Sequence, residues 1–317
     1  MRTLFITALL HIDLKGTFGK GVTLSRTRYV TNDHALVKGL LSRQFKTLAG
    51  AIEVSALLEA GAVVYENPEV NAVPQPSAAL EVLHRNLALT QLYLLCLWLV
   101  KDNSVNFELG FLEYPHGHPA AALSSNTIAA YFTNAQGETR VTTFNADEIR
   151  RARDYYSKLF SADHDAFTVV RIERTLPRHY NRLHRLTYYI HSARAASDVG
   201  MKISQYMTCY ETLFLTDPSE LSHKLAERVA YFVGTDGPER RSIYDDLKLA
   251  YSIRSKTVHG DRLSDRQANE ASRLSTRCDS LLRTTLLKIV GSERLTGNFI
   301  GNSDALEDYM LKLTLGA

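Results

Sequence analysis

The sequence predicts an α+β fold, with a mixed α/β domain over residues 1–145 followed by an all-α helical bundle over residues 178–292. Strand-like patterns are confined to the first part, where short apolar runs alternate with Gly- and Pro-containing connections. The second part carries apolar residues at helical spacing between recognisable capping residues. A length of 317 residues agrees with about two domains.

In the first domain we expect a strand over residues 3–10, because the charged residues that follow and the lack of a cleavage site exclude a secretion signal. Helical spacing follows over 33–49. Residues 67–77 carry three prolines and form a connection. A helix then runs from Ser77 to about Lys101; its apolar stretch is too short for a membrane span and contains Gln91. Further strands are predicted over 107–113 and in a hairpin of residues 128–133 and 139–144 around Asn134–Gly137.

Residues 146–177 are predicted to be a basic connecting helix and strand. Arginines and aromatic rings alternate through this segment and into the next. This mixture is typical of a phosphate-binding track with stacking platforms, but also of a helix whose arginines lie in solvent. The alternation comprises Arg171, Arg174, Tyr180, Arg182, Arg185, Tyr188 and Tyr189, among others.

The bundle is predicted from helices over residues 198–215, 220–234, 237–260 and 264–290. Asp217, Pro218 and Glu220 form a capping arrangement for the second of these. The tail, residues 293–317, holds a short amphipathic helix over 304–315. Such helices pack into a bundle by burying their apolar faces together.

Arg254 lies within the apolar stripe of the third bundle helix, and His259 directly precedes Gly260. A guanidinium needs a partner there, and a histidine exchanges protons near neutral pH. The pair favours phosphodiester chemistry, although Arg254 could instead meet a carboxylate and His259 could cap the helix. Their Cβ directions differ by about 140° on an ideal helix. The two side chains would meet if Arg254 reaches along the axis, if the helix unwinds near Gly260, or if a second copy contributes one.

The segment Arg254-Ser-Lys-Thr-Val-His259-Gly resembles the Arg-x4-6-His motif of the HEPN superfamily, specifically its Apea-like branch. Tyr210-Glu211-Thr-Leu-Phe and the run from Glu220 to Gly234 resemble the helices that precede this motif in that branch. The resemblance extends over roughly residues 178–290. One departure is Ser255, where active members often have Asn, Asp or His.

The resemblance implies a metal-independent endoribonuclease in which the RNA 2′-OH attacks the adjacent phosphate and leaves a 2′,3′-cyclic end. Arg254 would neutralise charge on the phosphate and His259 would act as acid or base, with Glu211, Ser255 and Lys256 in support. It also implies RNA as partner, a homodimer with a composite active site, and a cytoplasmic role in prokaryotic antiviral defence or as a toxin. The alternative is a non-catalytic HEPN interaction or nucleotide-sensing module, with a regulatory partner protein or ligand at the first domain.

Other patterns indicate no cofactor and no membrane segment. A net charge of +3 is too small to argue for nucleic acid. Three widely spaced cysteines fit neither a disulfide framework nor a zinc site. His116 and His118 lack a carboxylate or thiol at a supporting spacing, so we expect no metal. Ser222-His223 is interpreted as a solvated helix face.

Overall fold

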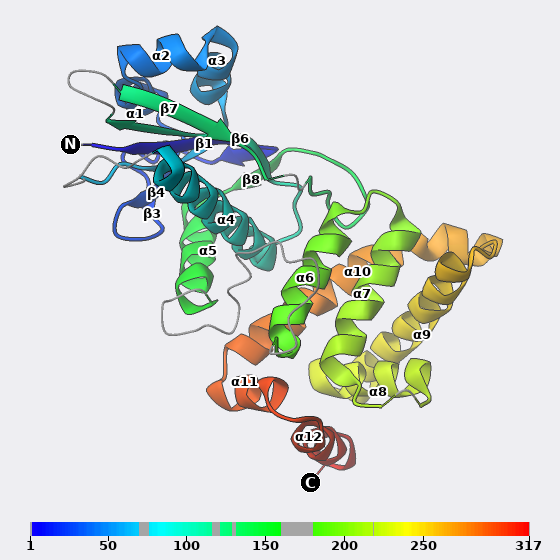
Figure 1. The fold of residues 1–317 in the computed structure, drawn as a ribbon. Helices are drawn as coiled ribbons and strands as arrows, with labels where there is room; N and C mark the ends of the chain where they lie inside the picture. Colours follow the sequence, from blue (N-terminus) through cyan, green and yellow to red (C-terminus); the bar gives the residue numbers. More distant parts are fainter. Residues whose placement is uncertain are drawn as a thin grey trace. The chain divides into compact units, whose positions relative to one another are not determined.

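The computed structural model describes residues 2–69, 76–115, 121–128, 131–159, 180–217 and 219–316. It divides into two compact units (Figure 1). Unit 1 comprises residues 1–131 and 139–158, and unit 2 comprises residues 132–138 and 159–317. The predicted α+β class is confirmed, because unit 1 contains a six-stranded sheet and the described part of unit 2 is built from helices.

Unit 1 is a sheet with helices on both faces (Figure 1). The sheet order is β3-β4-β5-β1-β6-β7, every neighbouring pair is antiparallel, and β2 and β8 form a separate parallel pair. The strands are β1 Leu4–Leu10, β2 Ile12–Leu14, β3 Val22–Thr23, β4 Arg28–Thr31, β5 Ala62–Glu66, β6 Asn106–Pro115, β7 Ala121–Asn126 and β8 Thr142–Phe144. The helices are α1 His34–Leu40, α2 Arg43–Ala49, α3 Ala51–Glu59, α4 Pro76–Val100 and α5 Ala146–Leu159.

The central strand β1 is buried on both faces because it packs against different helices on each side. Leu4 and Ile6 join the core beneath α1–α3, together with Phe45. On the other face, a Cβ added at Gly110 of β6 would lie 2.5 Å from a methyl carbon of Leu87 in α4. Glycine at this position therefore lets α4 approach the sheet closely.

Two predictions for unit 1 were wrong in detail. The expected helix over 33–49 is two helices, because Ser42 adopts an extended backbone and accepts the Phe45 N–H as the N-cap of α2. The hairpin over 128–133 and 139–144 is not formed within its described residues. Instead, the Thr133 N–H donates to the Arg194 carbonyl at 2.8 Å, and β8 pairs with β2. The expected turn residues 134–137 therefore belong to unit 2, whereas residues 142–144 belong to unit 1.

Unit 2 is a helical bundle around α7. Most of its N-caps are Asp, Asn or Ser side chains that accept a backbone N–H of the first turn. The capping arrangement predicted for α8 does not form, because its N-cap Glu220 has a left-handed backbone and makes no side-chain cap hydrogen bond. The predicted helices agree with the structure within about two residues, whereas α6 and α11 were not predicted. The helices are α6 Arg182–Ala195, α7 Val199–Phe214, α8 Leu221–Val233, α9 Gly237–His259, α10 Asp265–Val290, α11 Glu293–Ile300 and α12 Ser303–Leu315.

Cations from neighbouring helices bind the C-terminal carbonyls of three bundle helices. The fully buried Lys202 of α7 donates to the Ala193 carbonyl at the end of α6, at 2.9 Å. Lys288 of α10 donates to the Phe232 carbonyl at the end of α8. Positive charge at a helix C-terminus offsets the negative end of the helix dipole. These contacts therefore join helices through their ends as well as through their apolar faces.

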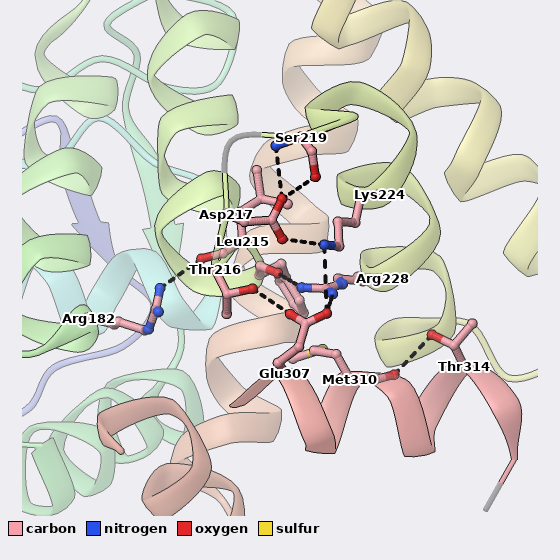
Figure 2. A network of polar contacts seen from close by, with 11 residues as sticks. Arg182, Leu215, Thr216, Asp217, Ser219, Lys224, Arg228, Glu307, Met310 and Thr314 are labelled. Atoms are coloured by element: carbon pink, nitrogen blue, oxygen red, sulfur yellow. Dashed lines mark hydrogen bonds and ion pairs between the residues drawn. The ribbon is translucent and has the colours of Figure 1, made fainter. Parts of the chain in front are cut away.

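The end of α7 receives two arginines, from α6 and α8 (Figure 2). Arg228 of α8 donates to the Phe214 carbonyl at 2.7 Å and also pairs with Glu307 of α12. Burial acts to raise the pKa of Glu307, but hydrogen bonds from Arg228 and Thr216 outweigh it and lower the pKa. Arg182 of α6 reaches the same helix end and donates to the Leu215 carbonyl at 2.9 Å. The charge of Arg228 is thus matched by a carboxylate.

No helix in the described ranges combines the length and the apolarity that crossing a bilayer requires. The apolar stretch of residues 88–100 belongs to α4 of unit 1, where Leu92 and Trp98 are buried. This agrees with its prediction as a core helix.

Candidate functional site

Arg254 lies on α9 and pairs with Glu211 of the adjacent helix α7. Its Nη2 is 3.4 Å from Oε2 of Glu211, and the two side chains are 26% and 20% exposed. The other carboxylate oxygen of Glu211 accepts a hydrogen bond from the Tyr251 hydroxyl at 2.9 Å. The Arg254 guanidinium also lies 5.4 Å from the centre of the Tyr251 ring. One half-buried carboxylate therefore holds both the arginine and the tyrosine.

The local sequence accounts for this arrangement. Tyr251 and Arg254 are three residues apart, so they lie on the same side of α9. Close packing of α9 on α7 is possible because α7 has Gly200 in its first turn, where a Cβ would lie 2.9 Å from the Thr257 hydroxyl oxygen. Glu211 comes from the last turn of α7, so Arg254 does meet a carboxylate from a neighbouring helix, the alternative that the sequence left open.

The hydroxyl of Tyr251 stays protonated and therefore donates a hydrogen bond to Glu211. Burial raises its pKa to about 12, and the hydrogen bond to the negatively charged Glu211 adds to this effect. The Nε of the Arg254 guanidinium is shielded from solvent and has no hydrogen-bond partner among the described residues, so a ligand would meet the terminal amino groups of this 26% exposed side chain. An oxyanion in contact with Arg254 would therefore find a charged donor already oriented by Glu211.

His259 is the last residue of α9 and its side chain is exposed. The helix remains regular up to this residue and ends at Gly260, whose φ of 76° is left-handed. The Asp261 N–H donates back to the Lys256 carbonyl at 2.9 Å and closes the end. In the described part of the chain no hydrogen bond or ion pair joins His259 to Arg254. The helix does not unwind in a way that would bring the two side chains together.

The two further candidates on α9 differ in their surroundings. Lys256 donates to the side-chain oxygen of Gln267 at 2.9 Å, and the amide nitrogen of Gln267 donates to the Ser252 hydroxyl at 2.8 Å. Gln267 is buried and also belongs to the capping box of α10. Lys256 therefore holds α9 to the start of α10. Ser255 is half-buried and makes no side-chain hydrogen bond to a described residue.

An open groove of about 690 Å³ lies between the start of α8 and the middle of α9, within unit 2. Its lining includes His223, Lys248 and Tyr251. Nδ1 of His223 is 2.7 Å from the Tyr244 hydroxyl, which leaves Nε2 without a partner among the described residues. Lys248 is half-buried, and its ammonium likewise has no hydrogen-bond or ion-pair partner among the described residues. Tyr251 lines the groove and its hydroxyl binds Glu211, so this tyrosine lies between the groove and the Arg254–Glu211 pair in the chain of contacts.

His223 was interpreted from the sequence as part of a solvated helix face. Its side chain is indeed exposed, but it also faces the groove beside Lys248. One signal could have identified it. His223 is the fourth residue of the run Glu220-Leu-Ser-His, and Lys248 lies three residues before Tyr251, on the same side of α9 as that tyrosine. His223 and Lys248 come together only because α8 packs on α9.

The remaining sequence candidates lie elsewhere. His116 and His118 fall outside the described residues. Within the residues that are described, no group of three or more His, Cys, Asp or Glu side chains is arranged to hold a metal ion. The thiols of Cys96, Cys209 and Cys278 are free and buried, and burial raises the pKa of each. They are structural parts of the two cores.

Comparison with known proteins does not identify a family for this chain. No protein-family model matches the sequence, no curated protein matches it, and no solved structure matches the fold. The assignment of a function consequently rests on the residues of the chain itself.

Proposed function

We propose that the chain is a metal-independent endoribonuclease of the HEPN type, acting in prokaryotic antiviral defence or as a toxin. The observation that supports this proposal is the position of Arg254. Its guanidinium is oriented by Glu211 and its side chain is 26% exposed. Tyr251, which binds the same carboxylate, lines an open groove that also carries Lys248 and His223.

In this proposal the groove receives the RNA backbone. Lys248 attracts the phosphates, and Arg254 neutralises the charge that builds up on the phosphate under attack. The 2′-oxygen of the ribose attacks the phosphorus and loses its proton to a base, while the 5′-oxygen leaves and takes a proton from an acid. The products are a 2′,3′-cyclic phosphate and a 5′-hydroxyl end. His259 serves in one of these two proton transfers.

We further propose that the site is completed in a homodimer. Because α9 is helical through His259, that side chain points away from Arg254 of the same copy. A two-fold axis beside the ends of two α9 helices would place His259 of one copy near Arg254 of the other. The exposed Val258, with 56% of its side chain accessible, lies at the same helix end and would be covered there.

A second candidate is a non-catalytic HEPN module that binds a partner protein. The ion pair itself favours this candidate, since Arg254 already has a carboxylate partner and His259 has none among the described residues. In that case Arg254 holds α9 to α7, and unit 1 serves in sensing a regulatory partner or ligand.

The test is incubation of the purified protein with total RNA in EDTA, followed by analysis of the fragment ends. We expect cleavage with 2′,3′-cyclic ends. His259→Ala and Arg254→Ala should each reduce the rate by about 10²–10⁴-fold, the usual contribution of acid–base groups and charged donors. Arg241→Ala is the matched control, because that arginine lies on the same helix but is 76% exposed. Intact RNA with and without EDTA would favour the non-catalytic module.

A further inference from the structure

A second pocket lies in unit 2, at the start of α6 and distinct from the groove. Its volume is about 400 Å³, which is within the range of sites for small organic ligands. Two arginines and two tyrosines contribute to its wall, together with residues of α7 and the α11–α12 connection. The lining includes Tyr180, Arg182, Arg185, Tyr189, Thr212 and Ile300.

The two arginines of this pocket lack a carboxylate partner among the described residues. Arg182 donates to the carbonyls of Thr212 and Leu215 and to the Ser303 hydroxyl, all neutral acceptors. Arg185 donates only its Nε, to the Tyr180 carbonyl at 3.2 Å. Both terminal amino groups of Arg185 therefore have no protein acceptor in the described part of the chain. Arg182 is held in place, whereas most donors of Arg185 are available to a ligand.

The charges in this pocket are unbalanced. Arg182 and Arg185 are three residues apart on one face of α6. Burial lowers the pKa of Arg182, and the nearby positive charge of Arg185 lowers it further. Two arginines at the C-terminal end of α7 differ in this respect: Arg228 pairs with the carboxylate of Glu307, whereas Arg182 meets the neutral carbonyl of Leu215 (Figure 2). A bound anion would supply the missing negative charge.

The tyrosines add a second kind of contact. Tyr189 lies one turn beyond Arg185 on the same face of α6, and its hydroxyl makes no hydrogen bond to a described residue. The Tyr180 ring lies on the other side of Arg185 in sequence and packs against His184, with 5.0 Å between ring centres. Arginine forks bind phosphate oxygens in pairs, and tyrosine rings stack on nucleobases.

We propose that this pocket binds a nucleotide, with a phosphate on Arg185 and Arg182 and the base against Tyr189. The nucleotide can be free in solution or the 5′-terminal residue of an RNA, because both present the same phosphate and base. The assignment does not rest on RNA cleavage. Binding to this pocket is measured directly, and a mononucleotide has no internucleoside linkage to cut.

The experiment is isothermal titration calorimetry of the full-length protein with AMP, with a 5′-phosphorylated dinucleotide and with inorganic phosphate. We expect both nucleotides to bind more tightly than phosphate. Arg185→Gln should weaken nucleotide binding by about tenfold to a hundredfold, the value of a hydrogen bond to a charged group. Tyr189→Leu should weaken AMP without changing the binding of inorganic phosphate.

Arg241→Gln is the matched control, since it removes the same charge from an exposed side chain of the same unit. It should bind the nucleotides as the wild type does. Tighter binding of the dinucleotide than of AMP would identify RNA as the source of the ligand, and equal binding would identify the free nucleotide. The proposal is overturned if the wild type binds neither nucleotide at millimolar concentration, if inorganic phosphate binds as tightly as AMP, or if Arg185→Gln binds like the control.

Discussion

Lowering the pH should destabilise the helical bundle through one half-buried histidine, His191 of α6, whose Nε2 is shielded from solvent. Its ring packs against Phe132, with 5.5 Å between ring centres, and its Nε2 has no hydrogen-bond partner among the described residues. Burial, and then the positive charge of Arg194, lower its pKa from 6.5 to about 4. The folded chain therefore keeps His191 neutral at a pH where the unfolded chain already binds a proton.

The direction and size of the effect follow from proton linkage. Above pH 6.5 neither state is protonated at His191, so stability is unaffected. As the pH falls from 6.5 to 4, only the unfolded state gains the proton, and the free energy of unfolding decreases. One pKa unit corresponds to about 1.4 kcal/mol, so the loss approaches about 3 kcal/mol below pH 4. Between pH 7 and pH 5 it amounts to about 2 kcal/mol.

The assay is denaturant unfolding followed by circular dichroism at 222 nm, at pH 7 and at pH 5, for the wild type and for His191→Phe. Phenylalanine keeps the ring against Phe132 but cannot titrate. The variant should lose about 2 kcal/mol less than the wild type over this interval. His259→Gln, at an exposed position, should behave like the wild type. If His191→Phe loses as much stability as the wild type, burial of a neutral histidine is not the cause.

Three further predictions concern the ion pairs and the assembly. Arg254→Ala should reduce the free energy of unfolding by about 2 kcal/mol. This value lies between those for surface and buried ion pairs, because Arg254 and Glu211 are 26% and 20% exposed. A melting temperature that calorimetry finds unchanged from the wild type would contradict this prediction. Glu307→Gln should lower the free energy of unfolding by about 1–3 kcal/mol, because it leaves the buried Arg228 without its carboxylate partner. The control is Asp308→Asn at the neighbouring position, which is 63% exposed; it should leave the melting temperature unchanged. Light scattering at micromolar concentration should give the mass of a dimer, and a monomer would remove the composite site.

Much of the bundle could be predicted from the sequence because its helices are locally determined. The N-caps Asp198, Asp236 and Ser264 precede regular apolar spacing, and each accepts the expected backbone N–H. The unit 1 sheet was predicted only in part. Both partners of β1 lie far away in sequence: Ala8 pairs with Val63 of β5, and Phe5 pairs with Leu112 of β6. Such pairings depend on the tertiary fold and leave a weak local signal.

In the candidate site, too, local features could be predicted from the sequence and contacts between helices could not. The position of Arg254 on an apolar stripe predicted that it needs a partner, and Glu211 of α7 provides it. The role of Lys256 could not be predicted, and the sequence carries only a partial signal for His223, because each role depends on a contact between helices. Lys256 is bound to Gln267 of the next helix, and His223 faces the groove only through the packing of α8 on α9.

The cations at the helix ends have a consequence for hydrogen exchange. The last turn of a helix normally frays and exchanges its amide hydrogens early, because opening it costs little. In this bundle, opening the end of α6 would leave the buried ammonium of Lys202 without its carbonyl acceptor. Opening the end of α7 would do the same to Arg228. We therefore expect the amides of these last turns to exchange as slowly as those in the middle of the same helices, so that the helices open together and not one end at a time.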